Sequence, residues 1–224
     1  MVLKVATKRF RWHPGFRIVP TRYPSISIFD RVADAREFDA LYALEEMTND
    51  RFREEAGKIE LVAPQDRVFG PGSGPIMAPF THINPLGSRF SDGSYGVLYA
   101  ARTRRTAIAE TKYHHARFLA ATSEGPMHLP MRVYGVDIDA DLHDLRRHGD
   151  AAIFNPDSYA ASQRLGRQLR DSGSAGVGFP SVRDPGGECV GIFKPRCVSA
   201  CKELAQLLYI WSGSGFSDVY ERSG

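Results

Sequence analysis

The alternation of hydrophobic and polar positions predicts short strands scattered among helices. Residues 25–32 and 131–138 alternate with a period of two, which is typical of strands with one buried face. Residues 96–101 form a short apolar run, as expected for a strand covered on both faces. Residues 176–182 and 188–193 are predicted strands on either side of a turn at residues 184–187. Residues 204–211 and 216–220 are predicted to form a closing hairpin.

Three helices are expected between these strands. Asp34 is a good N-cap and Glu37 follows three residues later, which predicts a capping box and a helix reaching about residue 49. Thr103 can cap a second helix over residues 103–119, and residues 157–171 form a third that ends before Gly173. The mixed order predicts an α+β fold: a single domain with mixed, mainly antiparallel sheets and flanking helices.

A segment rich in glycine, proline and serine interrupts this pattern at about residues 57–86. Long connections without regular structure are uncommon in compact domains unless they are functional or disordered. Its tip at residues 70–75 is expected to be mobile, and residues 59–62 are predicted to be strand-like. The hydrophobic side chains of Phe80, Ile83, Leu86 and Phe90 are expected to anchor the remainder.

Composition favours a globular protein with an ordinary core. The chain has 224 residues, of which 42% are hydrophobic and 11% aromatic. No apolar run approaches the roughly 20 residues that span a bilayer, and the basic N-terminus lacks the apolar stretch of a secretory signal. We therefore expect a cytoplasmic protein. Cys189, Cys197 and Cys201 are interpreted as small buried side chains, because no further cysteine or nearby histidine completes a metal set.

Positive charge is concentrated at the N-terminus of a chain whose formal net charge is +3. Residues 1–24 are interpreted as a basic arm preceding the main domain at residues 25–224. A solvated, partly mobile end is favoured over a nucleic-acid-binding arm, because no aromatic–basic interleaving or finger spacing is present. The cations of this arm are Lys4, Lys8, Arg9, Arg11, Arg17 and Arg22.

Residues 86–115 carry the most informative pattern, a loop with Arg89, a strand ending on Tyr99 and a helix with Glu110. Arg31 and Ser181 lie elsewhere in the chain. Each residue alone also has an ordinary structural interpretation: Glu110 as an exposed helical side chain, Tyr99 as core, and the others as solvated or turn residues.

Two stretches, GSRFSDGSYGVLYAARTRRTAIAE and GVGFPSVRDPGG, resemble the RES-domain family. The resemblance implies an ADP-ribosyltransferase-like fold and a bacterial type II toxin that cleaves the nicotinamide–ribose bond of NAD. ADP-ribose would then pass to a protein, water or phosphate. Catalytic roles are implied for Arg31, Tyr99, Glu110 and Ser181, and NAD contacts for Arg31, Arg89, Tyr99 and Ser181, without a metal.

That reaction needs charge placement more than strong acid catalysis. Nicotinamide leaves as a neutral ring, and the barrier lies in an oxocarbenium-like ribose, as in glycosidases. A carboxylate near the sugar and arginines on the pyrophosphate would suffice. Two departures are present: the family's Arg-Trp-Asn is Arg89-Phe90-Ser91 here, and no GxGxxG motif supports a Rossmann mode of binding.

The family resemblance also implies a partner, an Xre-type or other helix-rich antitoxin that covers the NAD cleft. This antitoxin is expected to contact a cation such as Arg31. Any link to nucleic acid is expected only through the antitoxin. A protein target of ADP-ribosylation stays open. The alternative is a non-catalytic protein-binding module that uses the Gly/Pro-rich loop and the basic arm; a nucleic-acid-binding domain is a third hypothesis. His114, one turn after Glu110, lacks a third partner for a metal and is interpreted as an orienting or surface residue.

Overall fold

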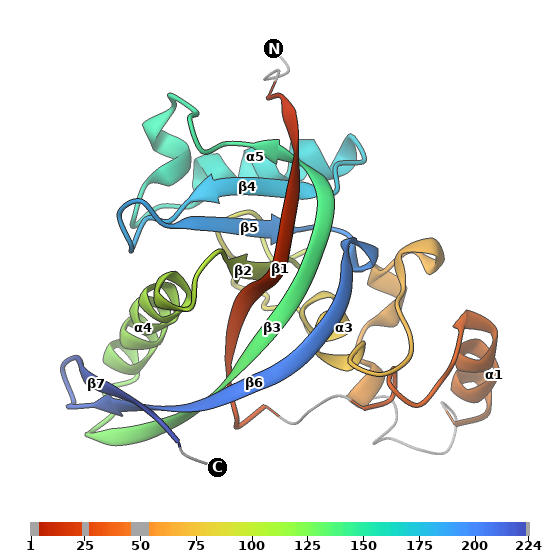
Figure 1. Cartoon of the computed structure of the whole chain (residues 1–224), viewed down its shortest axis with the longest axis horizontal. Helices are drawn as coiled ribbons and strands as arrows, with labels where there is room; N and C mark the ends of the chain where they lie inside the picture. Colours follow the sequence, from red (N-terminus) through yellow and green to blue (C-terminus); the bar gives the residue numbers. More distant parts are fainter. Residues whose placement is uncertain (1–4, 24–26, 46–53, 223–224) are drawn as a thin grey trace.

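The computed structural model describes residues 5–23, 27–45 and 54–222, and it shows a mixed, mainly antiparallel sheet flanked by helices (Figure 1). The α+β prediction is therefore confirmed. Within these described ranges the sheet has seven strands, in the order β1-β2-β5-β4-β3-β6-β7. The strands are β1 (Thr7–Pro20), β2 (Leu98–Ala101), β3 (Met127–Asp144), β4 (Gly176–Pro180), β5 (Glu188–Ile192), β6 (Val198–Trp211) and β7 (Phe216–Glu221).

The sheet closes on itself because β1 pairs with β2 at one side and with β3 at the other. β2 and β4 both pair with β5, and β4 joins the end of β3 in the single parallel pairing among the described strands. β6 and β7 extend the sheet beyond β3 as the predicted hairpin. Figure 1 shows the long strands β1, β3 and β6 side by side, with the shorter β4 and β5 crossing above them.

The N-terminal residues differ from the expected solvated arm. Residues 7–20 form β1, which pairs with β3 along most of its length. Phe10, Trp12 and Ile18 are buried on it, while the residues next to Phe10 and Trp12 are exposed. The segment therefore alternates around Phe10 and Trp12 as a strand with one buried face does, and Lys8, Arg9 and Arg11 are exposed.

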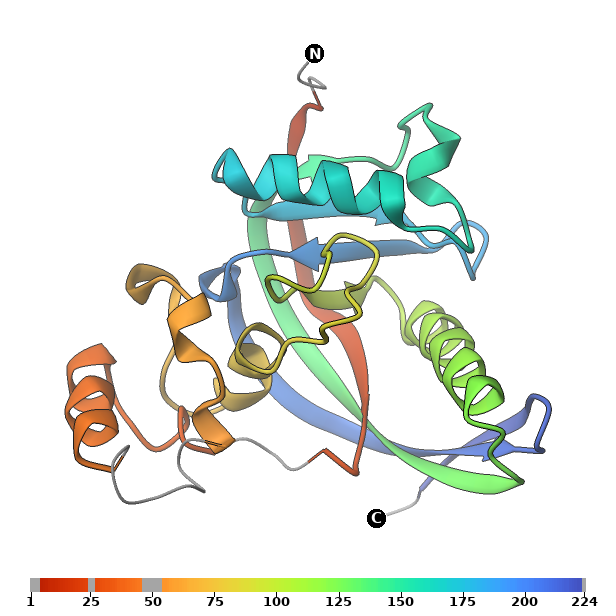
Figure 2. The same ribbon diagram turned by 180° about the vertical axis from the view of Figure 1, so that it is seen from behind.

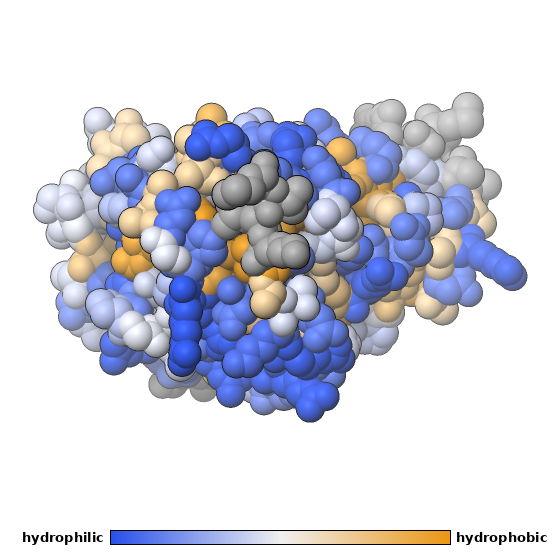
Figure 3. Space-filling view, turned by 90° about the horizontal axis from the view of Figure 1, so that it is seen from above, coloured by the Kyte–Doolittle hydropathy of each residue, from blue (hydrophilic) through white to orange (hydrophobic). Residues whose placement is uncertain are grey.

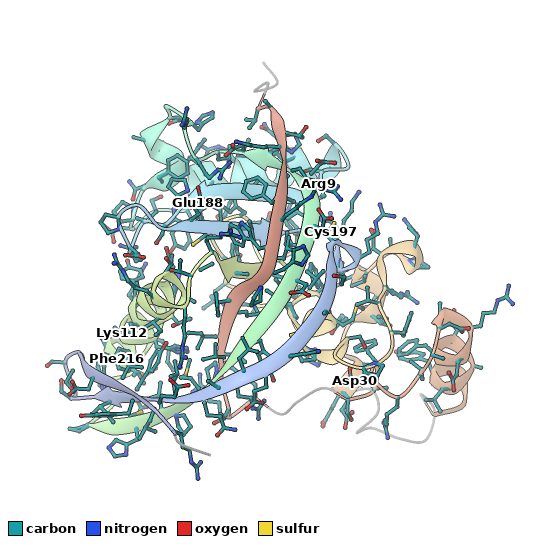
Figure 4. The ribbon with its side chains drawn as sticks, viewed as in Figure 1. Arg9, Asp30, Lys112, Glu188, Cys197 and Phe216 are labelled. Carbon is teal, nitrogen blue, oxygen red and sulfur yellow. The ribbon has the colours of Figure 1, made fainter. Side chains whose placement is uncertain are left out.

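Those cations are matched by an acidic stripe on β3. Arg9 donates through Nε to Asp139 at 2.6 Å and through Nη1 to Asp141 at 3.2 Å, and Arg11 lies 3.5 Å from Asp139. Figure 4 shows Arg9 on β1 beside β3. Cross-strand pairs of opposite charge favour this register. Basic residues near the N-terminus therefore neutralise the aspartates of the neighbouring strand β3.

Two of the three predicted helices begin as expected, and the third begins at Ala160 instead of residue 157. Glu37 accepts from the amide of Ala33 at 2.6 Å and Asp34 accepts from the amide of Glu37 at 3.0 Å, a capping box at the start of α1 (Ala35–Glu45). Residues 46–49 of the predicted helix lie outside the described residues. Thr103 caps α4 (Arg104–Ala121), accepting from the amide of Thr106. The third helix, α5 (Ala160–Asp171), ends before Gly173, which has a positive φ of 85°. Figure 2 shows α5 packed over β4 and β5, with α4 on one side and α1 on the other.

The segment around residues 27–82 departs most from expectation. Residues 27–34 form turns and bends where a strand was predicted, with residues 24–26 outside the described part. Two 3₁₀ helices, η1 (Ile59–Leu61) and η2 (Pro64–Asp66), occupy the predicted strand-like region, and α3 (Gly74–Thr81) follows. The Asp30 carboxylate accepts from Ser73 Oγ at 3.2 Å and from the Gly74 amide at 2.7 Å. The presumed mobile tip is thus anchored at the start of a buried helix.

The side chains predicted to anchor residues 80–90 divide into two groups. Phe80 and Phe90 are buried and Ile83 is half-buried, but Leu86 is 89% exposed. Leu86 lies in a turn where Asn84 Oδ1 accepts its amide, so its side chain projects into solvent. Periodicity does not distinguish the two cases, because this loop has no regular repeat.

Two clusters of buried hydrophobic side chains pack the described helices against the sheet. One packs β1 and β3 against α1 and α3, and the other packs β3, β4 and β5 against α4 and α5. Cys189 and Cys201 are buried and Cys197 is partly exposed; all three are free thiols, and Cys197 lies near the start of β6 (Figure 4). Viewed from above, the surface is mainly hydrophilic, with separate hydrophobic patches (Figure 3). None of the described helices is long and apolar enough to cross a membrane.

Candidate functional site

A cleft of about 370 Å³ opens between the β1–β2 part of the sheet, helix α4 and the loop at residues 84–91. Its volume is within the range of small-molecule sites. The floor is apolar and the walls carry arginine, tyrosine, glutamate and histidine. The lining residues include Phe16, Arg17, Arg89, Tyr99, Glu110, His114, Tyr159, Phe179 and Cys189.

Glu110 lies on α4 and points into this cleft. Its carboxylate accepts a hydrogen bond from Ser181 Oγ at 2.6 Å through Oε1, while Oε2 faces His114 Nε2 at 3.9 Å. The side chain is only 20% exposed. Two residues separated by 71 positions in the chain, both predicted for the site, are therefore joined directly.

Ser181 follows β4 and has its hydroxyl fixed by the turn around it. Its Oγ accepts from the amides of Arg183 at 3.2 Å and Asp184 at 2.9 Å. Because both amides are donors, the single hydroxyl hydrogen is left to donate to Glu110. The turn thus orients one oxygen of the Glu110 carboxylate.

Asp184 secures the same turn to the start of α4. Its buried carboxylate accepts from Thr106 Oγ1 at 2.7 Å and from Arg105 Nη2 at 2.5 Å. The Thr106 hydroxyl, and then the Arg105 guanidinium, hold the pKa of Asp184 below its ordinary value. Glu110 lies one turn further along the helix from Thr106, so helix and turn move as a unit.

Tyr99 forms a wall of the cleft from the middle of β2. Its ring packs edge-to-face on Phe179 at 6.4 Å. Its hydroxyl accepts from the amide of Phe90 at 2.9 Å and lies 2.9 Å from Ser88 Oγ. Burial raises the pKa of Tyr99 to about 12, so the phenol is neutral at ordinary pH. It holds the loop that carries Arg89.

Helix α5 holds this loop from the other side. Gln163 Nε2 donates to the carbonyls of Ser88 at 3.1 Å and Ser91 at 3.2 Å. Gly166 lets the helix approach, because a Cβ at this position would lie 2.2 Å from the carbonyl oxygen of Phe90. The loop is therefore fixed, whereas Arg89 taken alone has the ordinary interpretation of a solvated loop residue.

Arg89 is consequently a buried cation, 8% exposed. Its Nη1 donates to the carbonyls of Ile153 at 3.3 Å and Asn155 at 3.1 Å, and the guanidinium lies 4.5 Å from the centre of the Tyr159 ring. Tyr159 also lines the cleft, and its buried hydroxyl has no hydrogen-bond partner within the described chain. A buried polar atom without a partner in a cleft is a position where a ligand can bind.

Arg17 is a further cation of the cleft that sequence reasoning missed. It lies on β1, and its Nη1 donates to the carbonyl of Tyr99 at 3.3 Å. No carboxylate of the described residues lies within ion-pair distance of it, and desolvation lowers the pKa of Arg17. Strict alternation over residues 7–20 would place Arg17 on the same face as exposed Arg9 and Arg11, but the register shift between Trp12 and Gly15 interrupts that alternation.

Arg31 is not in this cleft. It is exposed, in the irregular segment before α1, and is absent from the lining residues. Its neighbour Asp30 caps α3 and lies on the α1 side of the molecule, whereas Lys112, close to Glu110 on α4, lies on the opposite side (Figure 4). The strand expected to carry Arg31 to the site does not form. The structure instead brings together Arg89, Tyr99, Glu110 and Ser181, with Arg17 added.

The cleft offers anion-binding donors at Arg17 and Arg89 and a fixed carboxylate at Glu110. No group of three or more histidine, cysteine or acidic residues that could hold a metal is found in the described ranges. Arginine donors suit phosphate groups, and a desolvated carboxylate stabilises developing positive charge. The arrangement therefore fits an anionic substrate that becomes cationic at a second centre.

Comparison with known proteins gives consistent matches. The model of the RES domain matches residues 64–212. The uncharacterized protein y4oC of Sinorhizobium fredii (strain NBRC 101917 / NGR234) is 27% identical over 207 residues, covering 92% of this chain and 86% of the relative. The crystal structure of the M. tuberculosis MbcT–MbcA toxin–antitoxin complex contains a chain that is 12% identical, with a TM-score of 0.49, covering 89% of this chain and 87% of that one. Because the family model spans more than half of the sequence, this chain belongs to the RES domain family.

Proposed function

We propose that this chain cleaves the nicotinamide–ribose bond of NAD and transfers ADP-ribose to an acceptor. The observation that carries the proposal is the Glu110 carboxylate, fixed by Ser181 at 2.6 Å inside a cleft that also holds Arg17 and Arg89. The RES-family resemblance implies this reaction, and the cleft supplies the groups that the reaction needs.

Arg17 and Arg89 bind the pyrophosphate in this proposal. Both guanidinium groups are desolvated, and within the described chain neither forms an ion pair with a carboxylate. A buried cation without a counter-charge is costly, and a bound anion removes that cost. The unsatisfied Tyr159 hydroxyl next to Arg89 offers an additional donor.

Glu110 stabilises the ribose as the bond to nicotinamide breaks. The departing ring takes the bonding electron pair and leaves neutral, so the developing charge is the oxocarbenium-like sugar. Ser181 fixes Oε1, which leaves Oε2 for a ribose hydroxyl or the cationic centre. Tyr99 and Phe179 form an apolar wall that excludes water from the bond being broken.

Nicotinamide release from NAD by the purified chain, with and without inorganic phosphate, tests this proposal. Wild type should release nicotinamide, and Glu110→Ala should lose about 100-fold or more of the rate, as when a key electrostatic group is removed. Glu60→Ala, outside this cleft, is the matched control. Labelled NAD added to cell lysate then distinguishes a protein acceptor from water and phosphate. No release by wild type would leave the binding-module alternative.

We also propose that the chain is the toxin of a bacterial toxin–antitoxin pair that acts in the cytoplasm, where NAD is abundant. Family membership and the toxin–antitoxin neighbour support this role. The partner would be a helix-rich antitoxin that covers the cleft and blocks NAD entry. Co-expression tests it: a cognate antitoxin should restore growth of cells producing the wild-type chain, whereas cells producing Glu110→Ala should grow without it.

A further inference from the structure

We propose that His114 is the base that takes the proton from a hydroxyl acceptor as ADP-ribose is transferred. The inference deepens the proposed NAD cleavage and rests on it. In this inference Glu110 stabilises the ribose as nicotinamide leaves, and His114 activates the acceptor. The acceptors that the cleft activates are then neutral O–H groups, either water or a protein hydroxyl.

The position of His114 at the cleft mouth is the first argument. It lines the cleft one helical turn after Glu110, and its Nε2 lies 3.9 Å from Glu110 Oε2. The His114 side chain is 53% exposed, whereas that of Glu110 is 20% exposed. An acceptor that enters from solvent therefore meets the imidazole before it reaches the buried carboxylate.

The second argument is that Glu110 is poorly placed to be the base itself. Oε1 is occupied by the Ser181 hydrogen at 2.6 Å. The carboxylate must also stay anionic while the ribose carries positive charge, and protonating it would remove that stabilisation. A second group is therefore needed to take the proton.

The third argument is the charge around His114. Arg117 faces it from α4, Arg183 from the turn after β4, and Arg89 from the loop across the cleft; Glu110 is the opposing carboxylate. The Tyr113 ring lies edge-on at 5.4 Å. Partial burial, together with the three arginines, lowers the pKa of His114 despite the pull of Glu110 in the other direction. The imidazole is thus neutral and able to accept a proton near pH 7.

The step balances without any further reactant. The C1′–N bond breaks and its electron pair goes to the nicotinamide ring nitrogen. A lone pair of the acceptor oxygen forms the new C1′–O bond, and the proton of that O–H passes to a nitrogen of neutral His114. The resulting imidazolium is stabilised by the adjacent Glu110 carboxylate and then releases the proton to solvent.

Azide separates this role from a structural one, because azide attacks as an anion and has no proton to lose. Nicotinamide release and the ADP-ribosyl product are measured with water alone and with added sodium azide. His114→Asn should lose about 100-fold of the rate with water, as for loss of general base catalysis. With azide its rate should return to within about threefold of wild type. His128→Asn, an exposed histidine on β3 outside the cleft, is the matched control.

The pH profile provides a second measurement. The wild-type rate with water should fall at acid pH as His114 becomes protonated, and the azide reaction of His114→Asn should lack that step. An equal loss with water and azide would show a structural role and overturn the inference, as would an unchanged rate in His114→Asn. If wild type releases no nicotinamide under any condition, the proposed function itself fails.

Discussion

Arg17 combines a cost to stability with a gain in binding. Its guanidinium is desolvated, donates to the Tyr99 carbonyl at 3.3 Å, and has no described carboxylate beside it. A charge in this position destabilises the folded state until an anion binds. Binding and stability should therefore respond to its removal in opposite directions.

Replacing Arg17 by Met should weaken NAD binding by about 2–5 kcal/mol, the range for losing one partner of a buried charge contact. The same change should raise the free energy of unfolding of the ligand-free protein by ~1 kcal/mol, because it removes a partly buried charge that no described carboxylate compensates. Isothermal titration with NAD in a Glu110→Gln background, and urea denaturation, measure the two effects. Arg31→Met is the matched control, since Arg31 is exposed outside the cleft; an equal loss of affinity there would contradict the site described.

At the scale of elements, the contact between the start of α4 and the turn after β4 sets the geometry of Glu110. The Thr106 hydroxyl donates to buried Asp184 at 2.7 Å, and the amide of Asp184 donates to Ser181 Oγ. Arg105 also binds Asp184, but its side chain is 79% exposed, so solvent screens this ion pair. The hydrogen bond from Thr106 is therefore the stronger link.

Thr106→Val should lower the free energy of unfolding at pH 7 by about 1–2 kcal/mol, the range for a hydrogen bond to a charged group. The pKa of folded Asp184 lies below its ordinary value, so this stabilisation is present above about pH 4 and is lost as pH falls through the folded value. The difference between wild type and variant in urea denaturation should therefore shrink as the pH falls below about 4. Thr122→Val, at the far end of α4, should show no such pH dependence.

The elements predicted correctly are those with local signals. The capping box of Asp34 and Glu37 and the cap of Thr103 determine where α1 and α4 begin, and both depend on residues a few positions apart. The spacing of Tyr99 and Glu110 likewise follows from one strand and the next helix. β1 was not predicted because its apolar residues are interspersed with nearly as many cations, and the acidic stripe on β3 that neutralises Arg9 and Arg11 is more than a hundred residues away.

Separation along the sequence also explains which residues of the candidate site were predicted correctly. Arg89, Tyr99 and Glu110 share one loop–strand–helix unit, so their order in the sequence is preserved in space. Arg31 was placed on a strand that local alternation suggested, but its segment instead buries Ile28 and Phe29 through turns and caps α3 with Asp30. Arg17 reaches the cleft through the pairing of β1 with β2 and β3, which no local pattern specifies.

On the scale of the whole molecule, β1 closes the sheet by pairing with β2 and β3, and its Phe10 side chain packs against β4. The Phe10 ring lies over Gly178 of β4, where an added Cβ would be 2.0 Å from the ring. Phe10 is 3% exposed, and the Arg146 guanidinium lies 4.6 Å from the centre of its ring. The N-terminal segment therefore packs directly against β4, with the Phe10 ring in the space that a side chain at Gly178 would occupy.

This packing predicts a specific coupling between two distant positions. Phe10→Ala should lower the free energy of unfolding by about 3–5 kcal/mol, the usual cost of removing a buried phenylalanine. Gly178→Ala should also destabilise wild type, because the new methyl collides with the ring. In the Phe10→Ala background that collision is absent and the methyl fills part of the cavity, so Gly178→Ala should cost nothing or restore stability. Urea denaturation of the four proteins gives the coupling energy. Strict additivity would mean that residues 7–20 do not pack across the sheet, and Arg17 would then have no route into the cleft.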